Sequence, residues 1–382
     1  MKGQLATMPG MEPALQYLTD TVRAATAARQ PLRIRGGGSK DFLGQAFTGT
    51  VLDVRAHAGV VSYEPSELVV TARCGTPLAE LEALLAAQGQ CLAFEPPHGL
   101  GQGQSTATVG GMVSAGLSGP ARATVGTVRD FVLGAQLING QGELLTFGGQ
   151  VMKNVAGYDV SRLLAGAMGT LGVLAEVSLK VLPVAPAETT LAFELDQVSA
   201  LDALHRWGCQ PLPLNASCWV KDGERRLLFV RLRGAVAAVE AACRTMGGQR
   251  MDGEGVQRDW ADCREQRLPF FTQASPGAAL WRVSVPQTAP AATLGPAQPD
   301  DQLVEWQGAQ RWLWAPASEV GAIRAQAQAL GGHATLFRPA AEADRAVGVY
   351  TPAPAAVRAI EQRLRAEFDP AGIFNPGRMA SV

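Results

Sequence analysis

The feature that most constrains this sequence is the uneven distribution of its glycines. Of 43 glycines in 382 residues, 17 lie in the 74 residues from Gly99 to Gly172. Because glycine has no side chain and tolerates positive φ, such a stretch brings backbone close to something or turns it sharply. It is a poor core, since each glycine in a helix is about 1 kcal/mol worse than alanine. We therefore expect a large ligand to lie against this stretch.

The second half of the chain differs in composition from the first. All seven tryptophans lie between Trp207 and Trp314. A boundary near 183–190 fits this shift, because the segment 180–186 ends a strand in a proline-bearing connector. A chain of this length usually forms two domains that each bury their own core. We predict a first domain at 1–186, a second at 187–350, and a C-terminal helix and tail at 351–382 that returns to the first.

Helix and strand signals alternate early in the chain and give way to hairpins later. One helix is marked by Thr76 as N-cap, Pro77 at its first position and Gly89 as its stop. Asn139 to Gly142 is a hairpin turn. The other predicted elements are a helix at 13–29, strands at 32–35, 51–54, 67–73, 131–138, 143–147 and 171–181, and a helix at 354–368.

The second half contains a weak internal repeat of strand, helix and glycine pair. The two copies are 226–248 and 310–332. Chance similarity of two amphipathic helices is the alternative reading. With a strand at 191–195 and a helix at 199–207, the repeat favours an antiparallel sheet with helices on one face, in the ferredoxin-like manner. The proline- and alanine-rich segment Ser284 to Asp301 predicts a long exposed loop. The fold class that results is α+β.

Composition excludes several classes of protein. With 47% apolar residues, 18% charged residues and a net charge of −1, the chain is neither disordered nor covered by a nucleic-acid-binding surface. Its six cysteines form no CxxC pair, so we expect reduced thiols and no metal site or iron-sulfur cluster. No apolar run approaches the roughly 18 residues of a membrane span, so we expect a cytoplasmic chain.

The first candidate binding segment directly follows the short strand at 32–35. It runs Arg35, Gly36, Gly37, Gly38, Ser39, Lys40, Asp41. Consecutive glycines let backbone amides converge on one point as an anion-binding nest, and the Ser39 hydroxyl can donate to a phosphate oxygen. A tight surface turn has the same sequence character. The segment is neither a Walker sequence nor a dinucleotide-binding fingerprint.

The second candidate segment, Thr106 to Pro120, consists almost entirely of small residues. It carries short hydroxyl donors at Thr106, Thr108, Ser114 and Ser118. A flat or extended ligand could lie against this backbone. We therefore predict a binding surface rather than a purely structural segment.

Six motifs in order resemble the vanillyl-alcohol oxidase/PCMH family of FAD enzymes. Within that family they are most similar to the E subunits of bacterial glycolate oxidases (glycolate dehydrogenases). The similarity is dense over 31–183 and specific in the tail, with only fragments such as Leu280-Trp281-Arg282 between. The motifs are 35–40, 108–111, 125–130, 153–159, 169–176 and 374–377.

The resemblance implies a PCMH-type FAD-binding domain of two subdomains, followed by a smaller cap domain. It implies that Gly36 to Lys40 surround the pyrophosphate, with Arg35 and Asn375 in the same binding set. The backbone around Ala175, Glu176 and Val177 would approach the flavin or the adenine. The remaining cofactor-lining residues that it implies are Thr108, Gly110, Gly111, Ser114, Gly116, Ser118, Gly119, Gly126 and Thr127.

The chain departs from the family pattern in its histidines. Relatives that bond the flavin covalently have a histidine where this chain has Ser39, so non-covalent FAD is expected. Hydroxyacid-oxidising relatives have a Gly-Glu-His-Gly segment that is absent here, and no proton acceptor is evident. His98, Tyr158 and Lys153 are weak catalytic candidates. A loop histidine is more often simply solvated, and the other two could equally position a turn.

The function that the resemblance implies is that of a non-autonomous subunit. It would be the FAD-binding subunit of a multi-subunit glycolate dehydrogenase, with a flavoprotein D subunit and a separate iron-sulfur subunit that receives the electrons from glycolate oxidation. The complex would be cytoplasmic, held at the inner membrane only through partners. The alternatives are a free-standing FAD-dependent dehydrogenase of D-lactate or another 2-hydroxyacid, and a non-redox assembly subunit stabilised by FAD.

Overall fold

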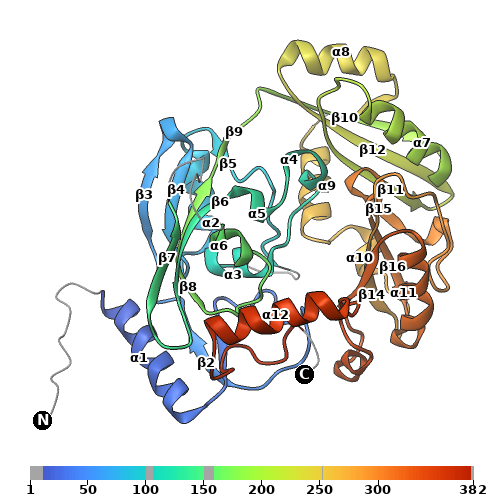
Figure 1. Cartoon of the computed structure of the whole chain (residues 1–382). Helices are drawn as coiled ribbons and strands as arrows, with labels where there is room; N and C mark the ends of the chain where they lie inside the picture. The colour runs from blue at the N-terminus through green and yellow to red at the C-terminus, as the bar shows by residue number, and fades with distance from the viewer. Residues whose placement is uncertain (1–11, 100–105, 150–158, 252, 380–382) are drawn as a thin grey trace, which may run out of the picture.

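The computed structural model describes residues 12–99, 106–149, 159–251 and 253–379. Two large antiparallel sheets stand side by side (Figure 1). The first part of the molecule, in blue and green, is built around a five-stranded sheet. The second part, in yellow and orange, is built around an eight-stranded sheet. The predicted α+β class is confirmed.

The five-stranded sheet has the order β3-β4-β8-β6-β7, with every neighbouring pair antiparallel. The hairpin at Asn139 to Gly142 joins β6 and β7 as predicted, and the Asn139 side chain accepts from the backbone of Gln141 and Glu143. The helices α2 and α3 share the main core with this sheet. The bounds are β3 Val60–Glu64, β4 Val69–Arg73, β6 Val132–Ile138, β7 Leu144–Gly148, β8 Val173–Lys180, α2 Leu78–Ala86 and α3 Val109–Ala115.

A second, smaller layer carries the start of the chain and its end. The helix α1 (Pro13–Ala28) packs on the parallel pair β1 (Leu32–Arg35) and β2 (Thr50–Asp53). The tail returns to this layer, because Leu32 N–H donates to the Ile373 carbonyl and Asn375 N–H donates to the Leu32 carbonyl. Phe374 is buried in the same core.

The eight-stranded sheet consists of two copies of one topology. In the first copy the strand order is β13-β10-β12-β11. In the second it is β15-β16-β14-β17, which, counted along its own part of the chain, is the same order read in the opposite direction. The two copies join where β11 pairs with β15. Both are the ferredoxin-like pattern. The two segments of the predicted repeat, β12-α8 and β16-α11, occupy equivalent places, so the repeat is structural. The bounds are β10 Ala187–Glu194, α7 Gln197–Gly208, β11 Leu214–Asp222, β12 Arg225–Gly234, α8 Val236–Met246, β13 Gln249–Met251, β14 Ala279–Ser284, β15 Leu303–Glu305, β16 Gln310–Ala315, α11 Val320–Ala329 and β17 His333–Arg338.

The segment 284–301 is a long loop as predicted, with several exposed residues, but it is not exposed throughout because part of it packs on the sheet. In the second ferredoxin-like copy it takes the place that α7 holds in the first. Leu294 is fully buried in the core that α11 covers. The Arg311 guanidinium donates to the carbonyls of Ala289 and Pro290 and so fixes the segment over the sheet.

A second correction concerns Thr76. The helix α2 begins at Leu78 with no side-chain cap. The Thr76 hydroxyl accepts from Gly59 N–H at 2.9 Å and donates to the Arg73 carbonyl at 2.6 Å. Thr76 therefore holds the turn before β3, a strand that the sequence patterns did not indicate.

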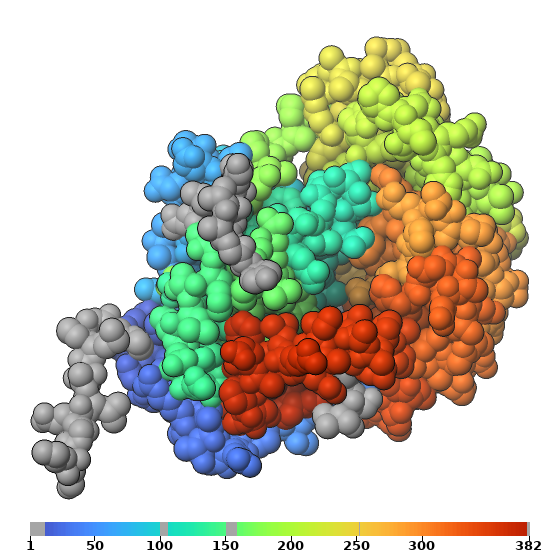
Figure 2. Space-filling view, in the orientation of Figure 1, coloured from blue at the N-terminus to red at the C-terminus, as the bar shows by residue number. Residues whose placement is uncertain are grey.

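The two faces of the large sheet have different neighbours. The helices α7, α8 and α11 cover the outer face. The inner face packs on α9 (Glu254–Arg264), on α10 (Pro269–Thr272) and on residues of the first part such as Leu43 and Met168. The helix α12 (Ala355–Phe368) runs along the lower front between the two parts (Figure 2).

The boundaries 1–186, 187–350 and 351–382 remain our proposal for the domains. The first boundary falls between β9 (Leu182–Pro183), which pairs with β5 (Gln90–Cys91), and β10 of the large sheet. Among the described residues, no helix is long and apolar enough to cross a membrane.

Candidate functional site

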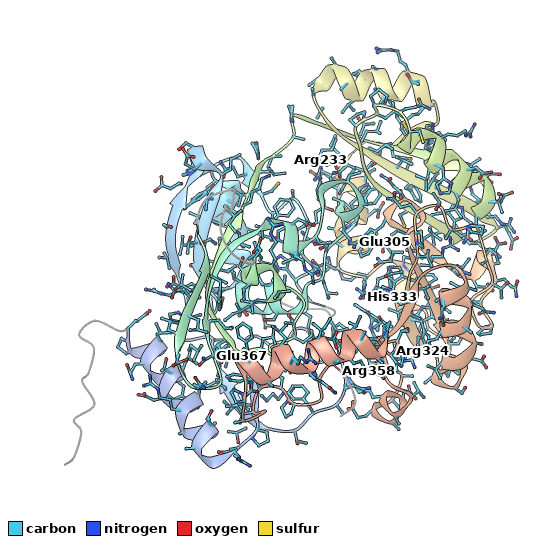
Figure 3. The ribbon with its side chains drawn as sticks, viewed as in Figure 1. Arg233, Glu305, Arg324, His333, Arg358 and Glu367 are labelled. Atoms are coloured by element: carbon cyan, nitrogen blue, oxygen red, sulfur yellow. The ribbon has the colours of Figure 1, made fainter. Side chains whose placement is uncertain are left out.

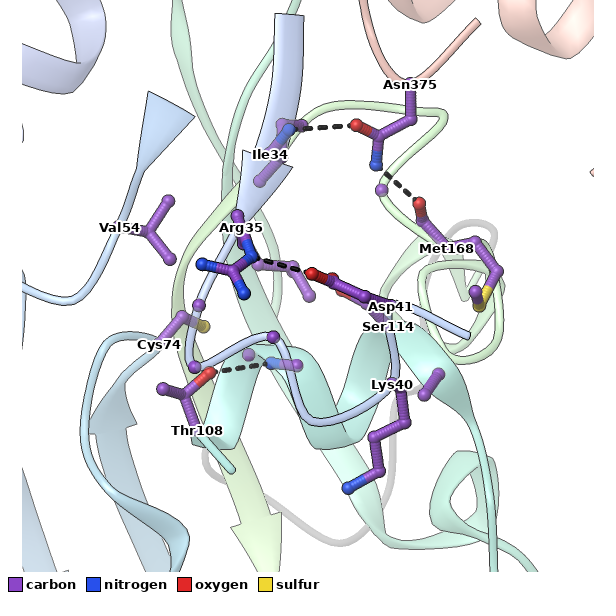
Figure 4. A pocket seen from close by; sticks show the side chains of 18 of the residues that line it. Ile34, Arg35, Lys40, Asp41, Val54, Cys74, Thr108, Ser114, Met168 and Asn375 are labelled. Atoms are coloured by element: carbon purple, nitrogen blue, oxygen red, sulfur yellow. Dashed lines mark hydrogen bonds and ion pairs between the residues drawn. The ribbon is translucent and has the colours of Figure 1, made fainter. Parts of the chain in front are cut away.

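An open cavity of about 710 Å³ lies where four segments of the chain meet (Figure 4). The segments are the loop after β1, the first turns of α3, the loop before β8 and the C-terminal tail. Eleven of the predicted cofactor-binding residues line it: Arg35, Gly36, Gly37, Gly38, Ser39, Lys40, Thr108, Gly110, Gly111, Ser114 and Asn375.

The loop after β1 lies so close to its neighbour that side chains are excluded. A Cβ on Gly37 would stand 1.4 Å from the Thr106 carbonyl oxygen, and one on Gly36 would stand 2.3 Å from the Thr108 hydroxyl. Gly38 has a φ of +74°. The loop therefore turns back beside Thr106 and Thr108 with its backbone bare toward the cavity, as an anion nest requires.

The adjoining wall is the start of α3. Thr108 caps this short helix, accepting from Gly111 N–H at 3.2 Å. Gly110 N–H donates to the Cys74 carbonyl at 2.8 Å, and a Cβ on Gly110 would lie 2.6 Å from the Cys74 Cβ. The helix is thus pressed against the end of β4, and its small residues leave room on the cavity side.

The charged side chains of the cavity are mostly cationic. Arg35, Lys40 and Arg378 line it, and Asp41 is the acid among them. The Asp41 carboxylate accepts from Arg35 Nε at 2.8 Å and from Arg33 Nη2 at 2.9 Å. The site therefore favours an anionic ligand.

Lys40 is held by backbone carbonyls. Its Nζ donates to the carbonyls of Pro97 at 2.6 Å and His98 at 2.8 Å. Burial lowers the pKa of this ammonium to about 8, although the charge of Glu265 acts in the opposite direction. A bound anion would supply the charge compensation that the site lacks.

Asn375 joins three segments around the cavity. Its Nδ2 donates to the Met168 carbonyl at 2.7 Å, and its Oδ1 accepts from Ile34 N–H at 2.9 Å (Figure 4). Three residues later, the Arg378 guanidinium donates to the Lys40 carbonyl at 3.0 Å. The side chains of Asn375 and Arg378 both form hydrogen bonds with other segments of the chain. Asn375 therefore shapes the cavity as well as lining it.

Eight predicted cofactor-binding residues are not among those that line this cavity, and five of them lie between Gly116 and Thr127. Gly116 and Thr127 line a second cavity, between the two parts of the molecule. The Ser118 hydroxyl accepts from Val128 N–H, and the Gly119 carbonyl accepts from Trp306 Nε1 at 3.0 Å. Gly126 has a φ of +100° before the turn that Thr127 and Asp130 cap.

Ala175, Glu176 and Val177 lie in the middle of β8, paired with β4 and β6. Ala175 and Val177 are fully buried in the cores. Burial raises the pKa of the Glu176 carboxyl. The structure does not bring these three residues to the cavity, where Leu174 is the neighbour that lines it.

The catalytic candidates gain no geometric support. Lys153 and Tyr158 lie outside the described residues. His98 is not part of the cavity lining. Its Nε2 lies 2.6 Å from Glu82 Oε2 on α2, so its imidazole is engaged there.

Other lining residues escaped the sequence patterns. Gly169, Gly172 and Arg378 stood in or beside recognised motifs, so a signal for them existed. Met168 likewise stood beside motif 169–176. For Val54 and Cys74 there was no signal, because only the chain's folding brings these apolar side chains to the cavity. The remaining members are Ile34, Asp41, Ala115 and Leu174.

The arrangement suits a ligand with a diphosphate and an extended body. Phosphate oxygens can be bound here by the backbone of the glycine loop after β1, by short hydroxyl side chains and by three cationic side chains. The walls from Val54, Cys74 and Leu174 are apolar and can contact planar groups.

The comparisons with known proteins agree with this chemistry. The family described as "FAD binding domain" matches residues 15–148. The chain is 45% identical to the glycolate oxidase subunit GlcE of Escherichia coli over 95% of this chain and 97% of that protein. It is 28% identical to the glycolate oxidase subunit GlcD of Bacillus subtilis over 45% of this chain and 36% of that protein.

A solved structure shares the fold. An alkyldihydroxyacetonephosphate synthase aligns with a TM-score of 0.62 and 16% identity, over 94% of this chain and 74% of that one. At this identity the likeness concerns the fold alone.

Proposed function

The chain belongs to the family of the glycolate oxidase subunit GlcE, and on that premise we propose that it is the FAD-binding subunit of a multi-subunit glycolate dehydrogenase. The complex would oxidise glycolate to glyoxylate. The chain is an FAD-dependent oxidoreductase subunit. When bound, the FAD supplies a two-electron acceptor for 2-hydroxyacid oxidation.

The observation that carries the proposal is that the glycine loop after β1 packs tightly against Thr106 and lines a cavity whose charged side chains are mostly cationic. Gly36 to Gly38 line the cavity without side chains, and Gly37 packs against the Thr106 carbonyl. We propose that the backbone amides of this loop supply the donors that a pyrophosphate needs. Ser39, Thr108 and Ser114 add hydroxyls, and Lys40 adds a charge. We propose that these residues hold the FAD without a covalent link, because Ser39 cannot form one.

Partner subunits are part of the proposal. GlcE is by its name a subunit of glycolate oxidase, and 45% of this chain is also similar to GlcD. We propose that this chain assembles with a flavoprotein of the D type and with an iron-sulfur subunit that takes up the electrons. We also propose that the assembly is cytoplasmic and meets the inner membrane only through a partner, which fractionation of cells would test.

The decisive experiment is to purify this chain alone and record its visible spectrum. We expect bound flavin, with bleaching by glycolate only when the partner subunits are added. Bleaching without partners would favour a free-standing dehydrogenase. A flavin that keeps its redox state during turnover of the complex would favour a scaffold role. A colourless protein that takes up no FAD would overturn the proposal.

The nest itself is tested by Gly37→Ala. We expect this variant to lose FAD affinity by more than about tenfold, because the added methyl group overlaps the Thr106 carbonyl and opens the nest. The flavin-to-protein absorbance ratio and a fluorescence titration measure it. Gly208→Ala, whose Cβ would meet no atom within 4 Å, is the matched control. Equal flavin content in the two variants would contradict the assignment.

A further inference from the structure

A second cavity lies between the two parts of the molecule, and its titratable lining is entirely basic. Three arginines and one histidine line it, with no aspartate or glutamate among its described residues. Arg122 and Arg129 come from the first part. Arg282 and His333 come from β14 and β17 of the large sheet.

Arg282 is the most unusual of these residues. It follows Trp281 on β14 and belongs to the inner face of the sheet, where its guanidinium stacks over Phe337 at 5.3 Å. Its Nε is buried, and no described residue accepts a hydrogen bond from it. Burial lowers the pKa of Arg282 to about 10. A buried N–H donor without an acceptor is costly unless a ligand supplies one.

Arg122 and His333 line the same cavity as Arg282. The Arg122 guanidinium lies over the Trp306 ring at 4.3 Å, and burial lowers its pKa, although the charge of Asp130 acts in the opposite direction. Burial, together with the charges of Arg282 and Arg122, lowers the pKa of His333. His333 is therefore a neutral imidazole near pH 7 and can donate or accept a hydrogen bond.

A larger cleft opens onto the same residues. It shares Arg282, Gly332 and His333 with the second cavity and adds Arg324, Arg358 and Arg365, with Glu361 as its acid. Figure 3 shows His333, Arg324 and Arg358 close together where α12 meets the second part. On the molecular surface this region is hollowed above α12 (Figure 2). Such a lining attracts small anions toward Arg282.

The basic cavity adjoins the proposed cofactor cavity across a very thin wall. Ala115 lines the first cavity and Gly116 the second. From the facing loop, Met168 lines the first and Gly166 the second. A Cβ on Gly116 would lie 2.7 Å from the Gly166 Cα, so the backbones of the two segments touch at this wall.

We propose that Arg282, with Arg122 and His333, forms a binding site in this chain for the carboxylate of a small 2-hydroxyacid. A guanidinium binds a carboxylate through two parallel hydrogen bonds, which a single point charge cannot match. The inference rests on the proposed function for the choice of a small hydroxyacid, because the site lies beside the cofactor cavity. It gives this subunit its own contact with substrate or product.

The test is calorimetric titration of the purified full-length chain with glycolate and with oxalate. We expect both anions to bind and neutral ethylene glycol not to bind. Arg282→Gln should weaken oxalate binding by about 10- to 100-fold. Arg282→Lys, which keeps the charge but not the two-pronged geometry, should lie in between. Arg225→Gln is the matched control, since it removes the same charge at an exposed position paired with Glu194.

Each outcome decides the inference. Equal affinity in wild type and Arg282→Gln, binding of ethylene glycol, or no binding of either anion would overturn it. If Arg282→Gln fails to fold, Arg122→Gln serves instead, with weakening of at least about threefold expected. Because heat of binding is recorded independently of flavin absorbance, a chain that carries FAD but binds no carboxylate refutes only this inference. A chain without FAD refutes the proposed function.

Discussion

Single polar atoms set the properties of the cofactor cavity. Among the described residues, the hydrogen-bond acceptors of the Lys40 ammonium are neutral, namely the carbonyls of Pro97 and His98 and the hydroxyl of Ser39. Since burial places its pKa at about 8, a fraction of the chains loses this charge just above neutrality. A diphosphate would favour the charged form and raise the pKa again.

This residue predicts a pH dependence for FAD binding. Because the ligand raises the pKa of Lys40, affinity is complete below about pH 8 and falls as the pH rises further, by at most about tenfold per unit. Fluorescence titrations at pH 7, 8 and 9 measure it. Lys40→Met should bind FAD more weakly, with a flat profile over this range. A parallel decline in the variant would assign the effect to another group.

At the scale of elements, the C-terminal tail completes the site. The residues after α12 pair with β1 through Leu32, and Asn375 then ties β1 to the loop before β8. Asn375 has a φ of +40°, a conformation that asparagine adopts more readily than most residues. The tail therefore fixes the distance between two walls of the cavity.

We expect Asn375→Leu to lower the free energy of unfolding by about 2 to 4 kcal/mol, because Ile34 N–H and the Met168 carbonyl would be left buried without partners. Urea titration measures the loss, and flavin should dissociate at lower urea than from wild type. Gln210→Leu, which removes an exposed amide bonded to the Arg206 carbonyl, should change stability by less than about 0.5 kcal/mol. Similar losses of unfolding free energy in both variants would argue against a stabilising role for the Asn375 hydrogen bonds.

At the scale of the whole molecule, a buried ion pair joins the two parts. Glu95 of the first part accepts from Arg231 of β12 at 2.6 and 2.8 Å, and Arg231 is only 3% exposed. Burial by itself would raise the pKa of Glu95, but Arg231 and Arg233 outweigh it and hold that pKa below its ordinary value. The cavity proposed for a carboxylate depends on this interface.

We expect Glu95→Gln to destabilise the protein by about 3 to 5 kcal/mol at pH 7, because Arg231 would stay buried without its counter-charge. A carboxyl with a lowered pKa stabilises above its unfolded value, near 4.5, and loses this effect as the pH falls through the folded value. The difference in stability between wild type and Glu95→Gln should therefore disappear at acidic pH. Thermal unfolding between pH 7 and 3.5 measures it. Glu240→Gln, at an exposed pair with Arg250, should show no such difference.

Much of the architecture followed from local patterns. The strand at 32–35, the hairpin at 139–142 and the paired strand, helix and glycine segments of the second half all depend on turn chemistry and periodicity within a few residues. The packing of 284–301 and the role of Thr76 did not follow. Each depends on a distant partner, Arg311 in one case and Gly59 in the other.

The sequence by itself determined which segments would lack side chains, and the loops that it marked, at Gly36 to Gly38 and Thr108 to Gly111, line the cavity. Only the tertiary structure decided which side chains complete that site and what lies beside it. Asn375 and Arg282 stood in recognised fragments, but only the fold brings Asn375 against Met168 and Arg282 beside His333, residues that are far apart along the chain. The physical reason is that backbone conformation is a property of a residue and its neighbours, whereas burial and missing charge partners arise only when distant segments pack together.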